Sequence, residues 1–375
     1  MAETITKIDK LINELCPDGV EFKELGEVLD YEQPTKYIVK SVKYDDTFTL
    51  PVLTAGQTFI LGYTNENFGI YKANKTNPTI IFDDFTTSFH WVNFNFKVKS
   101  SAMKILTPKK NKEINFKFIY YAMRCIRYKP QNHARQWISK YSKIKLPIPP
   151  LPIQEEIVKI LDNFTELEAE LEAELEARNN QYEYYRNELL TFGDGVEFKK
   201  FQELLDNKIV TTIIPPKKIT KNNYANSGKF PIVDQGQNFI VGYTDDENVI
   251  VKKDRYVIFG DHTEAIKYID FAFAQGADGI KILKTNGLNT KYLYYALNNF
   301  YKKTGKYTRH FSFLKKIRIP IPPISEQERI VAILDKFDAL VNDISKGLPA
   351  ELEARKKQYE YYREKLLTFK EKKKA

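Results

Sequence analysis

The sequence predicts a mixed α/β (α+β) protein in which two similar globular domains are separated by two long antiparallel helices. The first observation is an internal repeat, since residues 18–23 return as 194–199 and residues 147–150 return as 320–323. The second is that each copy opens with short apolar and aromatic runs broken by turn residues, as strands do. The third is that each copy closes with a long helical periodicity. A unit of this length is a domain with an appendage, because solenoid repeats have periods of about 20–50 residues.

The bulk composition favours a folded, water-exposed protein. A chain of 375 residues is long enough for roughly two to three domains, and a hydrophobic content of 42% can fill their cores. No apolar run reaches the length of a transmembrane helix, and the polar residues 1–4 do not begin a secretory leader. Cys16 and Cys125 are too few for a disulfide framework. We therefore expect a cytoplasmic protein that has no membrane partner.

The net charge of +9 is unevenly distributed along the chain. Residues 165–178 contain six glutamates and one arginine, so the remainder is more basic than the total suggests. A basic surplus on globular domains favours a polyanionic partner, and DNA or RNA is the first candidate. The alternative is that the lysines serve only solubility or reflect the base composition of the genome.

The elements follow in the same order in each copy. Strands are expected at residues 79–82, 92–96, 255–259 and 268–271, and helices at residues 116–125 and 291–300, each with Tyr-Tyr-Ala. The Ile-Pro-Pro run that follows can continue neither a strand nor a helix. Before the first copy, residues 1–15 predict a short helix that should dock near the C-terminal helix, with an apolar face made of Ile5, Ile8, Leu11, Ile12 and Leu15.

Each copy ends in a long amphipathic helix. The apolar positions of the first are Ile153, Ile157, Ile160, Phe164, Leu167 and Leu171, and after an extra step of four at Leu175 they resume at Tyr182, Tyr185 and Leu189. That extra step is a stutter, which locally relaxes supercoiling. The apolar positions of the second are Ile330, Leu334, Phe337, Val341 and Ile344, then Leu352, Tyr359, Tyr362 and Leu366. Residues 347–349 (Gly-Leu-Pro) interrupt the second pattern, so a kink or short break is expected there.

Two helices with one apolar stripe each can bury the stripes against each other, and antiparallel pairing leaves one domain at each end. The alternative, two independent surface helices, is disfavoured because both exceed the usual length of a domain helix. The predicted segments are an N-terminal helix (1–15), a first domain (16–152), a central helical spacer (153–192), a second domain (193–324) and a C-terminal helical spacer (325–375).

No motif in the sequence favours catalysis. Residues 17–23 resemble a nuclease metal motif, but only two residues separate Asp18 from Glu21, and the copy at 194–199 reads as a domain-entry turn. Residues 77–80 are not the Asn-Pro-Pro-aromatic motif of a methyltransferase, and there is no phosphate-binding glycine loop. The four histidines lack metal-ligand spacing. We expect no catalytic residue, metal or cofactor in this chain.

Polar loops provide candidate DNA contacts. Amide side chains beside glycines can bond adenine edges, and those found here are Gln57, Gln235, Gln237 and Asn238. Loops that follow a predicted strand carry Thr86, Thr87, Ser88, Asp261, His262, Thr263 and Lys267. The alternative is that both groups only stabilise turns. Basic residues at matching places in the two copies are candidates for phosphate contacts, although a lone lysine is usually just solvated: Lys36, Lys43, Lys217, Lys218 and Lys221 early in each copy, and Arg135, Lys140, Arg309 and His310 before the prolines.

The repeated sequence Gln-Tyr-Glu-Tyr-Tyr-Arg lies in the long helices, at residues 181–186 and 358–363. Its tyrosines could stack on bases, but their periodic positions favour a core or a partner interface. The candidate partner-binding residues are Tyr182, Tyr185, Arg186, Tyr359, Tyr362 and Arg363.

Together these features resemble the specificity subunit of type I restriction–modification systems. The resemblance rests on the Pro-Ile-Pro-Pro run followed by residues 154–158 and 327–331, on Leu-Asp at 161–162 and 334–335, and on the repeated Gln-Tyr-Glu-Tyr-Tyr-Arg and Leu-Leu-Thr-Phe. It implies two target recognition domains that each read half of a bipartite, asymmetric DNA site. It also implies that two methyltransferase subunits bind the helical regions, that restriction subunits join the complex, and that the specificity subunit itself has no active site. The methyltransferase would use S-adenosylmethionine, and the restriction subunit ATP and Mg²⁺.

One departure separates the copies. Residues 81–86 read Ile-Phe-Asp-Asp-Phe-Thr where residues 258–263 read Ile-Phe-Gly-Asp-His-Thr, and the second version is the more family-like. We therefore expect the loop around Asp84 and Thr86 to differ in shape from its counterpart. Two other functions remain open: a coiled-coil scaffold that binds proteins but not DNA, which duplex binding by the assembled complex would exclude, and a nuclease, which would need metal-dependent cutting by the chain alone.

Overall fold

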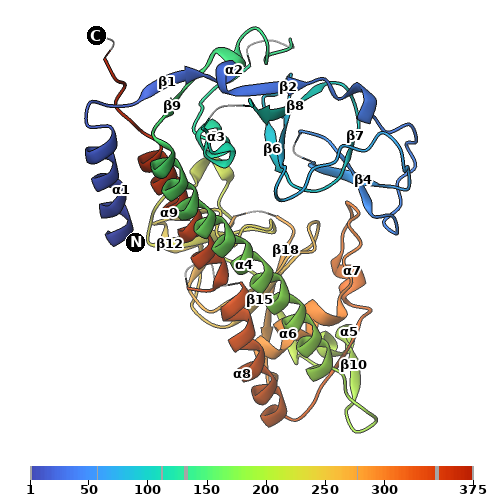
Figure 1. The fold of residues 1–375 in the computed structure, drawn as a ribbon. Coiled ribbons are helices and arrows are strands. Elements are labelled where there is room, and N and C mark those ends of the chain that lie inside the picture. Colours follow the sequence, from blue (N-terminus) through green and yellow to red (C-terminus); the bar gives the residue numbers. More distant parts are fainter. Residues whose placement is uncertain are drawn as a thin grey trace. The chain divides into compact units, whose positions relative to one another are not determined.

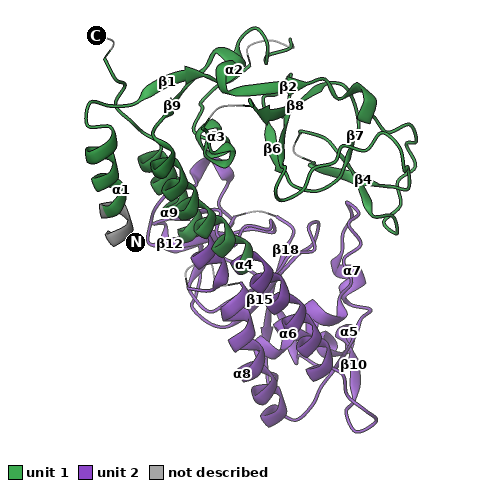
Figure 2. Cartoon of the chain, viewed as in Figure 1, with its two compact units in different colours: residues 1–170, 353–375 green, residues 171–352 purple. Residues whose placement is uncertain are grey.

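The computed structural model describes residues 2–56, 58–110, 113–130, 134–276, 278–342 and 346–373 (Figure 1). The chain forms two compact units (Figure 2). Unit 1 contains residues 1–170 and 353–375, and unit 2 contains residues 171–352. Both mix helices with sheets, so the predicted α/β class is confirmed. The predicted segment boundaries are not tested by this division and stay predictions.

Unit 1 contains two sheets and a two-stranded ribbon within its described residues. The four-stranded sheet has the order β2 (Leu29–Glu32), β8 (Met103–Pro108), β5 (Thr79–Asp83), β6 (Phe89–Val92). The three-stranded sheet has the order β4 (Ile60–Thr64), β3 (Leu50–Leu53), β7 (Lys97–Val98), and the ribbon pairs β1 (Glu21–Glu24) with β9 (Lys145–Ile148). The helices are α1 (Ala2–Leu15), α2 (Leu25–Val28), α3 (Phe116–Met123) and the 3₁₀ turns η1 (Pro34–Tyr37) and η2 (Tyr141–Lys143).

Unit 2 repeats this plan. Its first sheet has the order β11 (Val210–Ile213), β18 (Ile280–Thr285), β15 (Tyr256–Gly260), β16 (Ile266–Ile269). Its second has the order β13 (Gly242–Thr244), β12 (Phe230–Val233), β17 (Phe273–Gln275), β14 (Ile250–Val251), and its ribbon pairs β10 (Phe198–Lys200) with β19 (Arg318–Pro320). The helices are α5 (Phe201–Asp206), α6 (Thr290–Phe300), α7 (Phe311–Leu314) and the 3₁₀ turns η3 (Lys221–Asn223) and η4 (Glu247–Val249).

Buried polar side chains fix the helix that ends each domain. Asn115 caps α3 by accepting from the N–H groups of Lys117 and Phe118, and Asn289 caps α6 in the same way. Gln154, which is fully buried, accepts from Asn115 N at 3.0 Å and donates to Pro149 O at 2.7 Å. Gln327 makes the same two bonds, to Asn289 N at 2.9 Å and Pro322 O at 2.8 Å. The glutamine after each proline run therefore joins the start of the long helix to the capped helix.

The repeated Leu-Asp pair has a second structural role. The hydroxyl of Tyr121 on α3 donates to Asp162 at 2.5 Å, and Lys117 pairs with the same carboxylate at 2.8 Å. In unit 2 the hydroxyl of Tyr295 donates to Asp335 at 2.6 Å, and Lys291 pairs with it at 2.9 Å. These contacts hold the Tyr-Tyr-Ala helix of each domain against the long helix that follows.

The helix α4 (Leu151–Leu189) has 39 residues, and its two halves belong to different units. In unit 1 its first half packs on α9 (Leu348–Leu366), where the rings of Phe164 and Tyr362 stack at 5.6 Å and Glu168 lies 3.6 Å from Lys356. In unit 2 its second half packs on α8 (Ile324–Val341), where Tyr185 stacks on Phe337 at 5.2 Å. The helices of each pair run in opposite directions (Figure 1). The expected antiparallel pairing is confirmed within each unit.

Each unit therefore completes its helical layer with a segment from the other copy. Unit 1 combines the first domain with the Gln-Tyr-Glu-Tyr-Tyr-Arg segment of the second copy, and unit 2 does the reverse. The stacked pairs Phe164–Tyr362 and Phe337–Tyr185 join corresponding positions of the repeat. The expected break in the second helix is also confirmed, because α8 ends at Val341 and α9 begins at Leu348. Ile344, predicted in the apolar stripe, lies outside the described residues.

The N-terminal helix docks on unit 1, as expected. Ile8 is buried, and Leu11 and Ile12 pack against the core cluster that contains Tyr359 and Leu366 of α9. Lys7 pairs with Glu156 of α4 at 2.7 Å. Leu15, at the end of the predicted apolar face, is instead 46% exposed.

Two strand predictions need correction. Residues 92–96 are not a strand, because β6 ends at Val92 and β7 begins at Lys97. The alternating pattern there belongs to a crossing from one sheet to the other, in which Val92 and Phe96 are buried. The strand expected at 268–271 is β16, which ends at Ile269, before Phe271.

Candidate nucleic-acid interface

The hairpin turn after β5 has the same shape as the turn after β15. Asp83 N donates to Ser88 O at 2.8 Å, and Gly260 N donates to Ala265 O at 2.8 Å. Thr87 and Glu264 occupy corresponding positions, both with left-handed φ angles of 61° and 58°. The expectation that this loop differs between the copies is wrong, because backbone bonds and one left-handed residue set its shape.

Residue 260 nevertheless has to be glycine in unit 2. A Cβ added to Gly260 would lie 2.2 Å from Thr263 Oγ1 and 2.7 Å from Gln235 O. The hydroxyl of Thr263 donates to that same Gln235 carbonyl. In unit 1 the corresponding residue, Asp83, instead accepts from the N–H groups of Phe85 and Thr86 through its carboxylate.

In each turn a buried aspartate accepts hydrogen bonds from the segment that precedes the last strand of its domain, β9 in unit 1 and β19 in unit 2. Asp84 accepts from Gln136 N at 3.1 Å and Trp137 N at 2.8 Å. Asp261, which is 7% exposed, accepts from Phe311 N at 2.7 Å, and its carbonyl accepts from His310 N at 2.7 Å. These contacts give Asp261 a structural role, and its predicted contact with DNA stays a prediction.

The glycine-containing loop of unit 2 is fixed against this turn. Gln235 Oε1 accepts from His262 N at 3.2 Å, and Lys267 Nζ donates to Asp234 O at 2.9 Å and Asn238 O at 2.6 Å. Burial lowers the pKa of Lys267, which is only 6% exposed. Lys267 therefore stabilises the loop by bonding two of its backbone carbonyls, whereas the side chains of Gln237 and Asn238 are exposed on the loop.

In unit 1 the corresponding loop, around residues 55–56, is held by different side chains. Ser88 Oγ donates to Ala55 O at 2.5 Å, and His90 Nε2 lies 3.0 Å from Gly56 O. Thr86 is exposed beside this contact and Thr87 is buried. Gln57, predicted to contact DNA from the same loop, lies outside the described residues.

The predicted side chains thus fall into three groups according to their exposure. Thr87, Asp261, Lys267 and His310 are buried, while Ser88, Gln235, His262 and Thr263 are half-buried at the surface of the turns. The exposed members are Thr86, Gln237, Asn238, Lys36, Lys43, Arg135, Lys140, Lys217, Lys218, Lys221 and Arg309. Lys36 pairs with Glu32 at 2.7 Å, which raises the pKa of Lys36, and Lys218 pairs with Asp278.

A buried ion pair positions the basic loop of unit 1. Glu66 accepts from Lys40 N at 2.9 Å and Ser41 N at 2.8 Å, and lies 3.0 Å from Nζ of the fully buried Lys97. Burial acts to raise the pKa of Glu66, but the Ser41 N–H and the Lys97 ammonium outweigh it and hold that pKa below its ordinary value. Glu66 and Lys97 therefore fix the backbone of the loop at residues 40–41, between Lys36 and Lys43.

Unit 2 has an exposed basic loop of which only Arg309 was predicted to contact DNA. Residues 302–309 are all exposed and include Lys302, Lys303, Lys306 and Arg309. Tyr307 is 90% exposed, with its ring stacked on His262 at 5.4 Å. The signal available in the sequence was the presence of four cations and an aromatic residue within eight positions.

The repeated tyrosines divide according to the helix face. Tyr182 and Tyr359 are buried, at 7% and 6% exposure, and burial raises the pKa of Tyr182 to about 12. Tyr185 is 36% exposed and Tyr362 is half-buried, while Arg186 and Arg363 lie over the rings of Tyr182 and Tyr359. The positions that face solvent are Tyr184 and Tyr361, at 62% and 61%, and the sequence analysis missed both.

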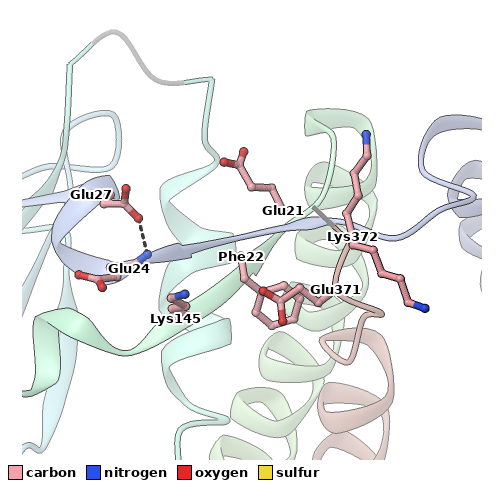
Figure 3. Close-up of a pocket in the computed structure, with 8 residues that line it drawn as sticks. Glu21, Phe22, Glu24, Glu27, Lys145, Glu371 and Lys372 are labelled. Carbon is pink, nitrogen blue, oxygen red and sulfur yellow. Dashed lines mark hydrogen bonds between the residues drawn. The ribbon is translucent and has the colours of Figure 1, made fainter. Parts of the chain in front are cut away.

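The nuclease-like segment forms an entry turn. Glu21 and Lys23 pair with each other at 2.9 Å on β1, and Glu24 N donates to Glu27 at 2.7 Å to cap α2. The three glutamates line an open pocket together with Phe22, Lys145, Glu371, Lys372 and Lys373 (Figure 3). Figure 3 shows the carboxylates of Glu21 and Glu27 well apart along the strand. No group of three or more His, Cys, Asp and Glu side chains within the described residues could hold a metal ion.

None of the helices in the described part of the chain combines the length and apolar character needed to cross a bilayer.

Comparisons with known proteins agree on one family. The model of the type I restriction modification DNA specificity domain matches residues 17–177 and again 179–354. A type I restriction enzyme specificity subunit from Escherichia coli is 42% identical over 94% of this chain and 95% of its own length. A putative type I specificity subunit from Haemophilus influenzae is 32% identical over 98% of this chain and its full length. In fold, the chain resembles the crystal structure of a type I S subunit from M. genitalium, with a TM-score of 0.62 at 16% identity over 93% of this chain and 96% of that one.

Proposed function

Because the chain belongs to the family of type I restriction–modification DNA specificity proteins, we propose that it reads a bipartite, asymmetric DNA site for a type I complex. The observation that carries this proposal is the presence of two units with the same order of corresponding strands and the same hairpin turn, whose loops expose different side chains. Two domains of similar fold that expose different loop residues are suited to a DNA site whose two halves differ in sequence.

The basic surface supports a duplex as the ligand. The exposed lysines and arginines of both units lie in loops, where they can reach phosphates and position the protein without specifying sequence. Exposed amides, such as those of Gln237 and Asn238, are suited to base edges.

The helices would recruit the other subunits. Two methyltransferase subunits would bind the two pseudo-equivalent helix surfaces marked by Tyr184 and Tyr361, and restriction subunits would join that assembly. The chain itself would be non-catalytic: S-adenosylmethionine would belong to the methyltransferase, and ATP and Mg²⁺ to the restriction subunit. The complex would act in the cytoplasm, where it meets the chromosome.

The test is methylation-sensitive long-read sequencing of a host that expresses the chain together with its methyltransferase. We expect a methylated motif of two short specified blocks separated by an unspecified spacer. If the chain is instead a protein scaffold, the purified complex should not bind a duplex through it, and this outcome would contradict the proposal.

A further inference from the structure

The basic loop of unit 2, residues 302–309, is held from inside by a buried carboxylate. Glu264 is 3% exposed and accepts from Tyr301 Oη at 2.8 Å, Thr304 N at 2.8 Å and Gly305 N at 2.9 Å. Burying a carboxylate is costly unless it is hydrogen-bonded or paired with a cation. The backbone at the bend of the loop supplies two of these bonds, so loop and carboxylate depend on each other.

The far end of the loop is anchored as firmly. His310 is fully buried, with Nδ1 at 3.1 Å from Glu264 Oε1 and Nε2 at 2.7 Å from Lys306 O. Its backbone N–H donates to Asp261 O at 2.7 Å. Both ends of an otherwise exposed loop are therefore joined to the turn after β15.

The tip of the loop lies beside His262, one of the residues predicted to contact DNA. The ring of Tyr307 stacks on that of His262, with an angle of 20° between the ring planes, and His262 N donates to Gln235. Gln237 Nε2 reaches Thr263 O at 3.5 Å in the same cluster. A tyrosine that is 90% exposed leaves a large apolar ring in water, which is costly without a partner.

This arrangement is not repeated among the residues of unit 1 that the structure describes. Thr87 occupies the position of Glu264, and the hydroxyl of Tyr128 donates to Gln136 at 2.7 Å, where Gln136 is the counterpart of His310. The buried carboxylate therefore belongs to unit 2, as expected for a device that serves one half of an asymmetric site.

We propose that residues 302–309 form a reading finger of unit 2, in which Tyr307 contacts bases, Lys303 and Lys306 contact phosphates, and Glu264 is the positioning residue. The inference rests on the proposed function. A tyrosine can meet a base edge with its hydroxyl or a base face with its ring, while lysines beside it neutralise the backbone.

The first experiment uses the complete chain assembled with its methyltransferase and a randomised duplex library. Tyr307→Ala should lower discrimination about tenfold at one or two neighbouring positions in one half of the motif, and leave the other half unchanged. The matched control is Ile214→Ala, also in unit 2 and also 90% exposed, which should leave both halves unchanged. Equal selectivity of Tyr307→Ala and wild type, or a loss spread over both halves, would overturn the inference.

The second experiment tests Glu264 as a positioning residue. Glu264→Gln should alter preference at the same base positions as Tyr307→Ala, and the double variant should be no worse than Tyr307→Ala alone. A purely structural role would lower the melting temperature and weaken binding to all sequences equally, which would contradict the positioning role.

The third experiment separates phosphate from base contacts. Lys303→Ala and Lys306→Ala should each reduce the salt slope of binding by about one unit without changing base preference. If the wild-type complex selects no bipartite sequence, the proposed function itself fails. If the wild type selects one while both lysine variants keep its salt slope and Tyr307→Ala keeps its selectivity, only the finger is excluded.

Discussion

At the scale of single residues, buried polar side chains set how each domain meets its long helix. Gln154 and Gln327 make the same pair of backbone bonds, and the Tyr–Asp bonds of each copy add a second joint. The sequence shows that these residues are repeated. It does not show which distant backbone groups they reach, so their role became visible only in the fold.

Gln154→Ala should destabilise unit 1 by about 1–3 kcal/mol, because it leaves the half-buried Asn115 N–H and the buried Pro149 carbonyl without their partner. Gln327→Ala should have a similar effect in unit 2. Denaturant unfolding of each variant measures the loss. Glu155→Ala, at an exposed neighbouring position, is the control and should fall within about 0.5 kcal/mol of wild type.

Glu66→Gln should destabilise unit 1 by about 3 kcal/mol at neutral pH, because the fully buried Lys97 loses its counter-charge. The folded-state pKa of Glu66 is lowered, so its stabilisation is complete above the unfolded value of about 4.5 and is lost as the pH falls through the lowered pKa. Urea unfolding between about pH 7 and pH 3 should therefore show a gap between wild type and variant that narrows with acidity.

A matched control for that measurement is Glu247→Gln. Glu247 pairs with Lys229 at 2.5 Å, but both side chains are more than half exposed. This variant should cost less than about 1 kcal/mol at either pH. A loss as large as that of Glu66→Gln would show that burial is not what makes the Glu66–Lys97 pair important.

At the scale of elements, the helices were more predictable than the strands. The apolar periodicity located α4 and α8 within a few residues, because each buries a continuous face, and the helices expected around the repeated Tyr-Tyr-Ala are α3 and α6. The alternation of apolar and polar residues at 92–96 led to a wrong strand prediction. A chain that crosses between two sheets can bury alternate side chains just as a strand does. Which tyrosine of each Tyr-Tyr pair faces solvent depends on the partner helix, and the sequence alone did not fix it.

Tyr184→Asp together with Tyr361→Asp should reduce co-purification of the methyltransferase, because both exposed rings would be replaced by charges on the proposed docking surface. Either single variant should leave about one methyltransferase per chain, since the two surfaces are pseudo-equivalent. Tyr182 is a poorer choice for this test because its ring is buried in the core of unit 2. Native mass spectrometry gives the stoichiometry, with Ile214→Asp as the exposed control. Two bound copies in the double variant would exclude this surface.

Deletion of residues 171–174 should shorten the unspecified spacer of the DNA motif by one to two base pairs. The deletion removes about 6 Å of helix, compared with roughly 3.4 Å per base pair. Four residues are close to one helical turn, so Leu175 returns to nearly the face that Leu171 occupies. The stutter is lost as well, so some loss of stability is expected. Methylome sequencing of the deletion strain measures the spacer length directly. An unchanged spacer would show that the length of α4 does not set the distance between the two half-sites.

At the scale of the whole molecule, the chain is a duplication whose copies kept their framework and changed their loops. The order of strands and the joints to the helices agree between units, while Glu264 replaces Thr87 and Lys267 replaces His90 in the tied turns. The repeat and the two-domain plan could be predicted because both copies preserve their end segments. The buried roles of Asp261, Lys267 and His310 could not, since each depends on a backbone group far along the chain.

The two units should therefore read different half-sites. The exposed loop residues differ between the two copies, so the methylated motif should be asymmetric. Gln237→Ala with Asn238→Ala should alter only one of its halves. Recovery of a palindromic motif from the wild-type strain would contradict this expectation.

The exchange of helical segments between copies also constrains synthesis on the ribosome. Unit 2 can close as soon as residue 352 has emerged, because all of its segments precede that point. Unit 1, although its domain is made first, must wait for residues 353–366 before Phe164 can stack on Tyr362. A prematurely terminated chain would keep an exposed aromatic face on its first domain and attract chaperones or proteases. Unit 1, whose domain is synthesised first, is thus the later of the two to obtain all of its segments.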